Sequence, residues 1–157
     1  MQKITTFLWF DNQAEEAANF YTSLFDDSKV TGVHRYGESG PGEPGSVMTV
    51  TFELAGRQFT ALNGGPQFPF TEAISLSVDC ADQAEVDELW ARLTEGGEEA
   101  PCGWLKDKYG LSWQITPRKV IELLSDPDPV KSARAMKAVL GMKKIDIQAV
   151  VDAYEQG

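Results

Sequence analysis

The chain reads Cys102-Gly103-Trp104-Leu105-Lys106-Asp107-Lys108-Tyr109-Gly110-Leu111-Ser112-Trp113-Gln114 where two of its four tryptophans and one of its two cysteines come together. Lys108-Tyr109-Gly110 predicts a turn between two strands, which we expect at Trp104–Lys106 and Leu111–Pro117. A loop that only joins two strands has little use for so much aromatic surface. We therefore interpret this stretch as one wall of a pocket.

The hairpin ends the second of two similar units. Each unit is expected to contain a strand, a helix and three further strands. In the first unit these elements are predicted at Ile4–Phe10, from Asp11 or Asn12 to about Asp26, and at Lys29–Tyr36, Val47–Leu54 and Gln58–Leu62. In the second they are predicted at Glu72–Val78, from Gln83 to about Thr94, within Glu98–Gly103, and at the two strands of the hairpin. Gln13-Ala14-Glu15 recurs as Gln83-Ala84-Glu85, which supports an internal repeat with units at about 1–66 and 71–118.

The first strand is apolar on both faces. Side chains alternate along a strand, so Thr5, Phe7 and Trp9 share one face, while Leu8 and Phe10 lie on the other. This pattern is typical of a strand that is covered on both sides.

Residues 119–157 do not continue the repeat. Asp126-Pro127-Asp128-Pro129 interrupts the chain, and Val130–Leu140 and Ile145–Tyr154 then show the apolar spacing of two amphipathic helices. Ser125 or Asp126 is a possible cap for the first of them. We expect these helices to form a C-terminal extension that packs on a sheet or on a partner subunit, and we assign them no chemistry.

Composition excludes several classes of partner. The formal net charge of −10 and the pI near 4.5 disfavour nucleic acid, because such a protein repels phosphate backbones. No apolar run is long enough for a membrane span, and the N-terminus lacks the features of a signal peptide, so a cytoplasmic location is expected. Cys80 and Cys102 form neither a CxxC pair nor a disulfide framework, so both thiols are expected to be reduced.

The residues alone do not establish a catalytic centre. The single histidine, His34, has no neighbours at metal-ligand spacing. Cys102 lies between Pro101 and Gly103, and Lys106 or Lys108 could lower its pKa, so it is a candidate nucleophile without an assigned base. The chain contains no nucleophile elbow, phosphate-binding glycine loop or dinucleotide fingerprint.

Five motifs together resemble a known family. They are Phe20-Tyr21-Thr22-Ser23-Leu24-Phe25, Leu62-Asn63-Gly64-Gly65-Pro66, Asp82-Gln83-Ala84-Glu85-Val86-Asp87, Cys102-Gly103-Trp104-Leu105-Lys106-Asp107 and Gly110-Leu111-Ser112-Trp113-Gln114. With the two repeats, they are similar to the PhnB-like branch, labelled 3-demethylubiquinone-9 3-methyltransferase-like, of the glyoxalase/bleomycin-resistance/dioxygenase (vicinal oxygen chelate) superfamily. The resemblance implies an α+β fold in residues 1–118, with two βαβββ modules forming a curved, partly open barrel around a cavity. It also implies a homodimer.

The resemblance also locates the positions where the metal enzymes of the superfamily carry their ligands, typically His and Glu on the first and last strand of each module. Gln114 stands where the last strand of the second module usually has Glu. The other positions fall at Thr5 or Thr6, near Ala73, and at Ala61 or Asn63. These side chains do not make a useful divalent-metal site, so we expect neither a metal nor another cofactor. No glycine-rich strand-to-helix loop supports S-adenosylmethionine binding.

The leading hypothesis is a small-molecule-binding protein with a metal-free cavity. Eight residues are expected to line the cavity: Thr5, Phe7, Trp9, Asn63, Ser75, Ser77, Trp104 and Gln114. Aromatic rings and an amide suit a planar or amphipathic ligand. Two alternatives remain, namely an enzyme (a metal-dependent lyase or dioxygenase relative, or a methyltransferase as the label suggests) and a structural dimer with a collapsed, dry cavity.

Overall fold

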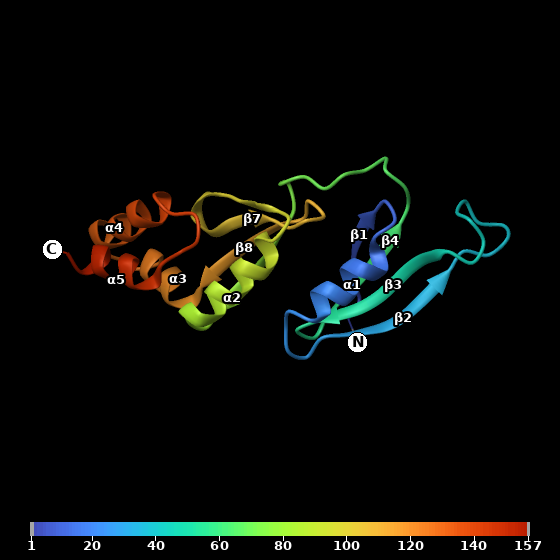
Figure 1. Cartoon of the computed structure of the whole chain (residues 1–157). Helices are drawn as coiled ribbons and strands as arrows, with labels where there is room; N and C mark the ends of the chain where they lie inside the picture. Colours follow the sequence, from blue (N-terminus) through green and yellow to red (C-terminus); the bar gives the residue numbers. More distant parts are fainter. Residues whose placement is uncertain (1, 157) are drawn as a thin grey trace. The chain divides into compact units, whose positions relative to one another are not determined.

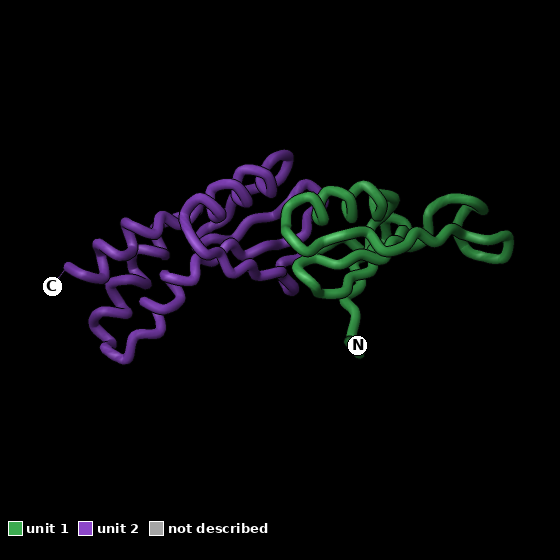
Figure 2. Tube along the Cα trace, turned by 90° about the horizontal axis from the view of Figure 1, so that it is seen from below, with its two compact units in different colours: residues 1–70 green, residues 71–157 purple. Residues whose placement is uncertain are grey.

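The computed structural model describes residues 2–156 and divides into two compact units, with the boundary in the sequence between Phe70 and Thr71 (Figure 2). Each unit contains one open four-stranded sheet, and the chain is of the α+β class (Figure 1). Every helix within residues 2–156 is too short or too polar to cross a membrane.

Unit 1 consists of β1 (Thr6–Phe10), α1 (Ala14–Thr22), β2 (Lys29–Arg35), β3 (Val47–Leu54) and β4 (Arg57–Asn63). Its sheet has the order β1-β4-β3-β2, with β1 parallel to β4 and the other neighbours antiparallel. The second βαβββ module, in unit 2, consists of β5 (Ser75–Cys80), α2 (Gln83–Thr94), β6 (Glu98–Glu99), β7 (Trp104–Lys106) and β8 (Ser112–Pro117). A short 3-10 turn, η1 (Pro101–Gly103), precedes β7.

The second sheet repeats the topology of the first. Its order is β5-β8-β7-β6, again with the first pair parallel and the others antiparallel. The registers also correspond, because Phe7 is opposite Thr60 and Ser77 is opposite Gln114. The predicted repeat of two βαβββ modules is therefore confirmed.

Helix α1 covers one face of the first sheet. Its buried residues Ala17 and Tyr21 face a strand surface that carries Phe52, and the Tyr21 and Phe52 ring centroids are 6.4 Å apart. Small alanines let the helix approach the sheet closely, and the burial of these apolar side chains stabilises the unit. The opposite face has no helix in this unit, and Phe7 on it is 62% exposed. The expected cover on both sides of the first strand is thus not found within unit 1.

Helix α2 has the same role in unit 2. Val86 and Leu93 are buried, as are Leu105 and Trp113 on the strands. The N-cap is Asp82, whose side chain accepts a hydrogen bond from the backbone N–H of Glu85 at 2.9 Å. This cap satisfies one of the N–H groups that a helix leaves open at its start.

The C-terminal extension contains three helices, α3 (Arg118–Leu124), α4 (Pro129–Leu140) and α5 (Ile147–Glu155). Their apolar stripes meet in one cluster around Val120, Val139 and Val150. The backbone N–H groups of Cys102 and Gly103 reach this extension by donating to the carbonyls of Met142 and Lys143, both at 2.8 Å. The sequence predicted that these apolar stripes would contact a sheet or a partner subunit. In the structure they pack mainly on one another.

Candidate functional site

Asp107 organises the turn of the hairpin quoted at the outset. Its carboxylate is 3% exposed and accepts hydrogen bonds from the backbone N–H groups of Tyr109 at 2.9 Å and Leu111 at 3.1 Å, and from the indole N–H of Trp113 at 2.9 Å. Gly110 adopts a positive φ of 90°, which glycine tolerates best. The sequence pattern indicated a turn here but not the role of Asp107.

The two tryptophans of the hairpin lie on opposite faces of the second sheet. Trp113 is fully buried on the face under α2, whereas Trp104 is opposite Gln114 on the other, open face. Only Trp104 can therefore contribute to a pocket on the open face. Part of the aromatic content that suggested a pocket wall belongs to the core.

Gln114 is held on the open face by a neighbouring strand. Its amide donates to the hydroxyl of Ser75 at 3.0 Å. Ser77 is opposite Gln114, and its hydroxyl is 3.5 Å from that of Thr116. The hydroxyl of Ser112 on the same face is buried and has no hydrogen-bond partner among the described residues. Unit 2 thus brings together four of the predicted residues: Ser75, Ser77, Trp104 and Gln114.

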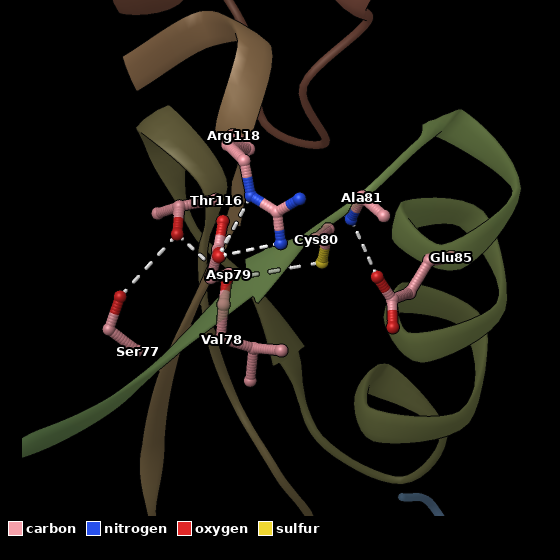
Figure 3. A network of polar contacts seen from close by, with 8 residues as sticks. All are labelled: Ser77, Val78, Asp79, Cys80, Ala81, Glu85, Thr116 and Arg118. Carbon is pink, nitrogen blue, oxygen red and sulfur yellow. Dashed lines mark hydrogen bonds and ion pairs between the residues drawn. The ribbon is translucent and has the colours of Figure 1, made fainter. Parts of the chain in front are cut away.

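Beyond Ser75, Ser77 and Gln114, further polar side chains lie at the ends of β5 and β8 (Figure 3). The guanidinium of Arg118 donates twice to Asp79, at 2.9 and 3.0 Å. On the other side of β5, Glu85 accepts from the backbone N–H of Ala81 at 2.7 Å and so fixes the turn into α2. The Arg118–Asp79 pair is largely exposed, so it contributes little to the free energy of unfolding. We assign it a role in positioning the chain.

Cys80 is a structural thiol. It is completely buried at the end of β5, and its Sγ is 3.9 Å from the carbonyl oxygen of Val78. Burial, reinforced by the carboxylates of Glu85, Asp79 and Asp82, raises its pKa to about 12. A thiol so resistant to ionisation is a poor nucleophile.

The raised pKa of Cys80 predicts a loss of stability in alkali. Below the ordinary value of 9.0, the thiol is protonated in both the folded and the unfolded chain. Between that value and about 12, the unfolded thiol loses its proton while the folded one keeps it, so stability falls across this window. When urea unfolding is measured at pH 8 and at pH 10.5, the free energy of unfolding should fall less between the two pH values for Cys80→Ala than for the wild type. An equal loss of unfolding free energy between pH 8 and pH 10.5 in the wild type and in Cys80→Ala would contradict the assignment.

The first unit contains the other predicted residues on β1 and β4. Thr5 lies just before β1, and its hydroxyl is 3.5 Å from the side-chain oxygen of Gln58. Trp9 donates its indole N–H to the carbonyl of Gly65 at 2.9 Å, and Phe68 lies edge-on to its ring with centroids 4.9 Å apart. These two contacts hold the Trp9 side chain in place, whereas the Phe7 side chain is largely exposed within unit 1.

Asn63 has a role that the sequence did not indicate. Its side-chain oxygen accepts from the backbone N–H of Ala14 at 2.8 Å, and its amide donates to the carbonyl of Val47 at 3.1 Å. Helix α1 begins after Gln13, which makes no side-chain cap, so Asn63 from a distant strand replaces the cap expected from Asp11 or Asn12.

A cavity of about 790 Å³ lies at the end of the first sheet where β1 and β4 finish and β3 begins. Trp9 and Asn63 both line it. Tyr36, which was not among the predicted residues, contributes a second aromatic side chain, and its O–H donates to the carbonyl of Asn63 at 2.6 Å. The remaining lining residues are Asp11, Asn12, Glu15, Pro41, Gly42, Ser46, Val47, Met48, Leu62, Gly64, Gly65 and Gln67.

The strand registers identify the residue of unit 1 that is equivalent to Gln114. Gln114 corresponds to Thr60 in the first unit, because these residues face the equivalent residues Ser77 and Phe7. Ala61 and Asn63, the positions that the resemblance offers in the first module, lie on the face of β4 that α1 covers, because side chains alternate along the strand.

These positions do not fit a resident metal. Gln114, Thr60, Thr5 and Ser75 offer only neutral oxygens, whereas a resident divalent metal usually has at least one imidazole, thiolate or carboxylate ligand. Within residues 2–156, no group of three or more His, Cys, Asp or Glu could hold an ion. S-adenosylmethionine also lacks its usual glycine-rich cradle, because the strand-to-helix turns at 11–13 and 81–82 contain no glycine.

Comparison with known proteins identifies the family. A family model described as 3-demethylubiquinone-9 3-methyltransferase matches residues 2–116. The chain belongs to this family. The solved structure of the PhnB protein from Bacillus cereus is 44% identical, and the match covers 74% of this chain and 99% of that one with a TM-score of 0.68. The expected PhnB-like membership of the vicinal oxygen chelate superfamily is therefore confirmed.

More distant structures share the fold alone. PA1353 from Pseudomonas aeruginosa is 19% identical, with 74% of this chain and 98% of that chain covered and a TM-score of 0.62. The fosfomycin resistance protein FosX from Listeria monocytogenes is 14% identical, with 74% and 93% covered and a TM-score of 0.51. No protein of curated function matches the chain.

Proposed function

We propose that this family member binds a small molecule without a metal or another cofactor. The observation that carries the proposal is Gln114, whose neutral amide is oriented by Ser75 on an open sheet face at the position where metal-dependent relatives are expected to carry a carboxylate. An amide in a fixed orientation can recognise a polar ligand group without ionising. The binding residues remain the eight proposed from the sequence: Thr5, Phe7, Trp9, Asn63, Ser75, Ser77, Trp104 and Gln114.

The domain proposal assigns ligand binding to residues 1–118 and a supporting role to the extension at 119–157. The family match to residues 2–116 supports this boundary. We further propose a cytoplasmic homodimer. The exposed Met136 and Leu140 on α4 offer apolar surface for an association between copies, and light scattering at micromolar concentration tests it.

The proposed site predicts that Trp9→Ala and Gln114→Ala lose ligand-induced stabilisation. In a thermal-shift screen against a panel of small amphipathic molecules, hits with the wild type should lose most of their shift in both variants. The physical reason is the loss of an aromatic contact surface in one variant and of the orienting amide in the other. Gln148→Ala, which changes an exposed amide on α5, should keep the wild-type shifts. Unchanged shifts in the Trp9 and Gln114 variants would show that the site is elsewhere.

Metal analysis separates this proposal from the enzymatic alternative. The purified protein is incubated with Ni²⁺, Zn²⁺, Fe²⁺ or Mn²⁺, dialysed, and analysed for bound metal. The neutral donors at Gln114, Thr60 and Ser75 predict no stoichiometric retention. Retention of one ion per chain would overturn the metal-free proposal and favour a metal-dependent lyase or dioxygenase relative.

A further inference from the structure

The cavity of unit 1 has few free hydrogen-bond donors. The indole of Trp9, the hydroxyl of Tyr36 and the amide of Asn63 each donate to a backbone carbonyl, at 2.9, 2.6 and 3.1 Å. The backbone N–H groups of Gly64 and Gly65 also donate to carbonyls, at 2.9 and 3.3 Å. A carboxylate or a phosphate would therefore find these five donors already engaged, and the side-chain amides of Asn12 and Gln67 add neutral donors without a positive charge.

The charged groups of the cavity are all acceptors. Asp11 and Glu15 line it, and no lysine, arginine or histidine appears among the described lining residues. The start of helix α1, which could attract an anion, is instead flanked by Glu15 and Glu16, and Asn63 already accepts from its first N–H. The local charge thus favours a cation and repels an anion.

The walls of the cavity suit a cation that also has an apolar body. Trp9 and Tyr36 supply aromatic rings, which attract cations through their negative faces. Met48 and Leu62 add apolar contact surface, and a volume of about 790 Å³ is within the range of small-molecule sites. A bare metal ion would gain little from such walls, whereas an organic cation can contact the rings with its apolar body and the carboxylates with its charge.

We infer that the cavity between Trp9 and Tyr36 binds a small organic cation, an alkylammonium or guanidinium compound, with Asp11 and Glu15 as its counter-charges. The inference rests on the proposed function, since Trp9 and Asn63 belong to both residue sets, and it adds the chemical class of the ligand. It assigns this recognition to unit 1 alone.

The test compares choline with its neutral isostere 3,3-dimethylbutan-1-ol. Binding is followed by NMR of the ¹⁵N-labelled full chain through the indole resonance of Trp9, which is assigned by its absence in Trp9→Phe. We expect choline to shift this resonance and to bind about 5- to 30-fold more tightly than the isostere, the range given by a cation–aromatic contact with nearby carboxylates. Sodium acetate, a small anion, should cause no shift.

Two isosteric substitutions identify the counter-charges. The double variant Asp11→Asn/Glu15→Gln should weaken choline binding about 2- to 30-fold, the range of two exposed ion pairs, and leave binding of the neutral isostere unchanged. Glu38→Gln removes a negative charge from the same unit at a residue that does not line the cavity, and it should bind choline like the wild type. Equal affinity for choline and the isostere, absence of choline binding, or insensitivity to the double variant would each overturn the inference.

The two proposals fail in different ways. If panel ligands depend on Gln114 while choline does not bind, the proposed function stands and the cationic inference is overturned. If choline binds with the expected dependence on Asp11 and Glu15 while Gln114→Ala changes no ligand response, the cation site stands and the wider ligand-binding set is wrong.

Discussion

Asp107→Ala is expected to lower the free energy of unfolding of unit 2 by about 3–5 kcal/mol, because it leaves buried donors without an acceptor. The backbone N–H groups of Tyr109 and Leu111 and the indole N–H of Trp113 all donate to this carboxylate. The site is almost completely buried, so water cannot replace the lost acceptor without opening the hairpin. Urea unfolding followed by tryptophan fluorescence measures the effect, since three of the four tryptophans lie in unit 2.

A double-mutant cycle distinguishes this mechanism from general damage to the hairpin. Asp107→Asn retains an oxygen for the backbone donors but turns an NH₂ group toward the indole of Trp113, so it should cost about 1–3 kcal/mol. Trp113→Phe removes the opposing donor, and the cost of Asp107→Asn should then be smaller. Asp26→Ala, at an exposed aspartate after α1, should change stability little. Equal costs of Asp107→Asn in both backgrounds would show that the indole contact contributes nothing.

The parts of the fold that depend on local patterns could be predicted from the sequence. Strand β3 alternates along its length, and helix α2 begins at an aspartate cap and ends before a Gly pair, so both have the predicted bounds. The strand expected at Glu72–Val78 instead begins at Ser75 and continues to Cys80. The reason is not local, since its partner β8 begins at Ser112, which is opposite Ser75, and residues before Ser75 have no strand to pair with.

The candidate site was predicted less completely because most of its contacts join distant residues. Asn63 caps α1 across 49 positions, and nothing in the sequence near Ala14 indicates this partner. Tyr36 was assigned to a strand end, and its position in the cavity depends on the hydrogen bond from its hydroxyl to the carbonyl of Asn63 on β4, 27 positions away. Asp107 could have been found, because an aspartate three residues before a glycine at a hairpin turn is typical of side-chain bonding to the following backbone.

Gly64→Ala is expected to disrupt the cavity of unit 1 and to destabilise that unit by about 1–3 kcal/mol. A Cβ atom at Gly64 would lie 2.3 Å from Cζ2 and 2.5 Å from Cε2 of the Trp9 indole. The ring cannot move aside freely, because it donates to the carbonyl of Gly65 and contacts the edge of Phe68. Either the indole leaves its place in the cavity wall or the turn at Gly64 shifts, and both outcomes should abolish the choline-induced change in the Trp9 resonance.

The chain offers a matched control and a compensating change for this prediction. Gly37→Ala adds the same methyl group in the same unit at a position with no atom within 4 Å, so it should leave stability and choline binding unchanged. In a Trp9→Leu background the smaller side chain removes the clash, and Gly64→Ala should then cost less than it does beside the indole. This rescue would show that the glycine is required for the close approach of Trp9, whereas an equal cost in both backgrounds would place the requirement in the backbone of the turn itself. The two outcomes decide whether this part of the family's Leu62-Asn63-Gly64-Gly65-Pro66 motif shapes the ligand cavity or only ends a strand.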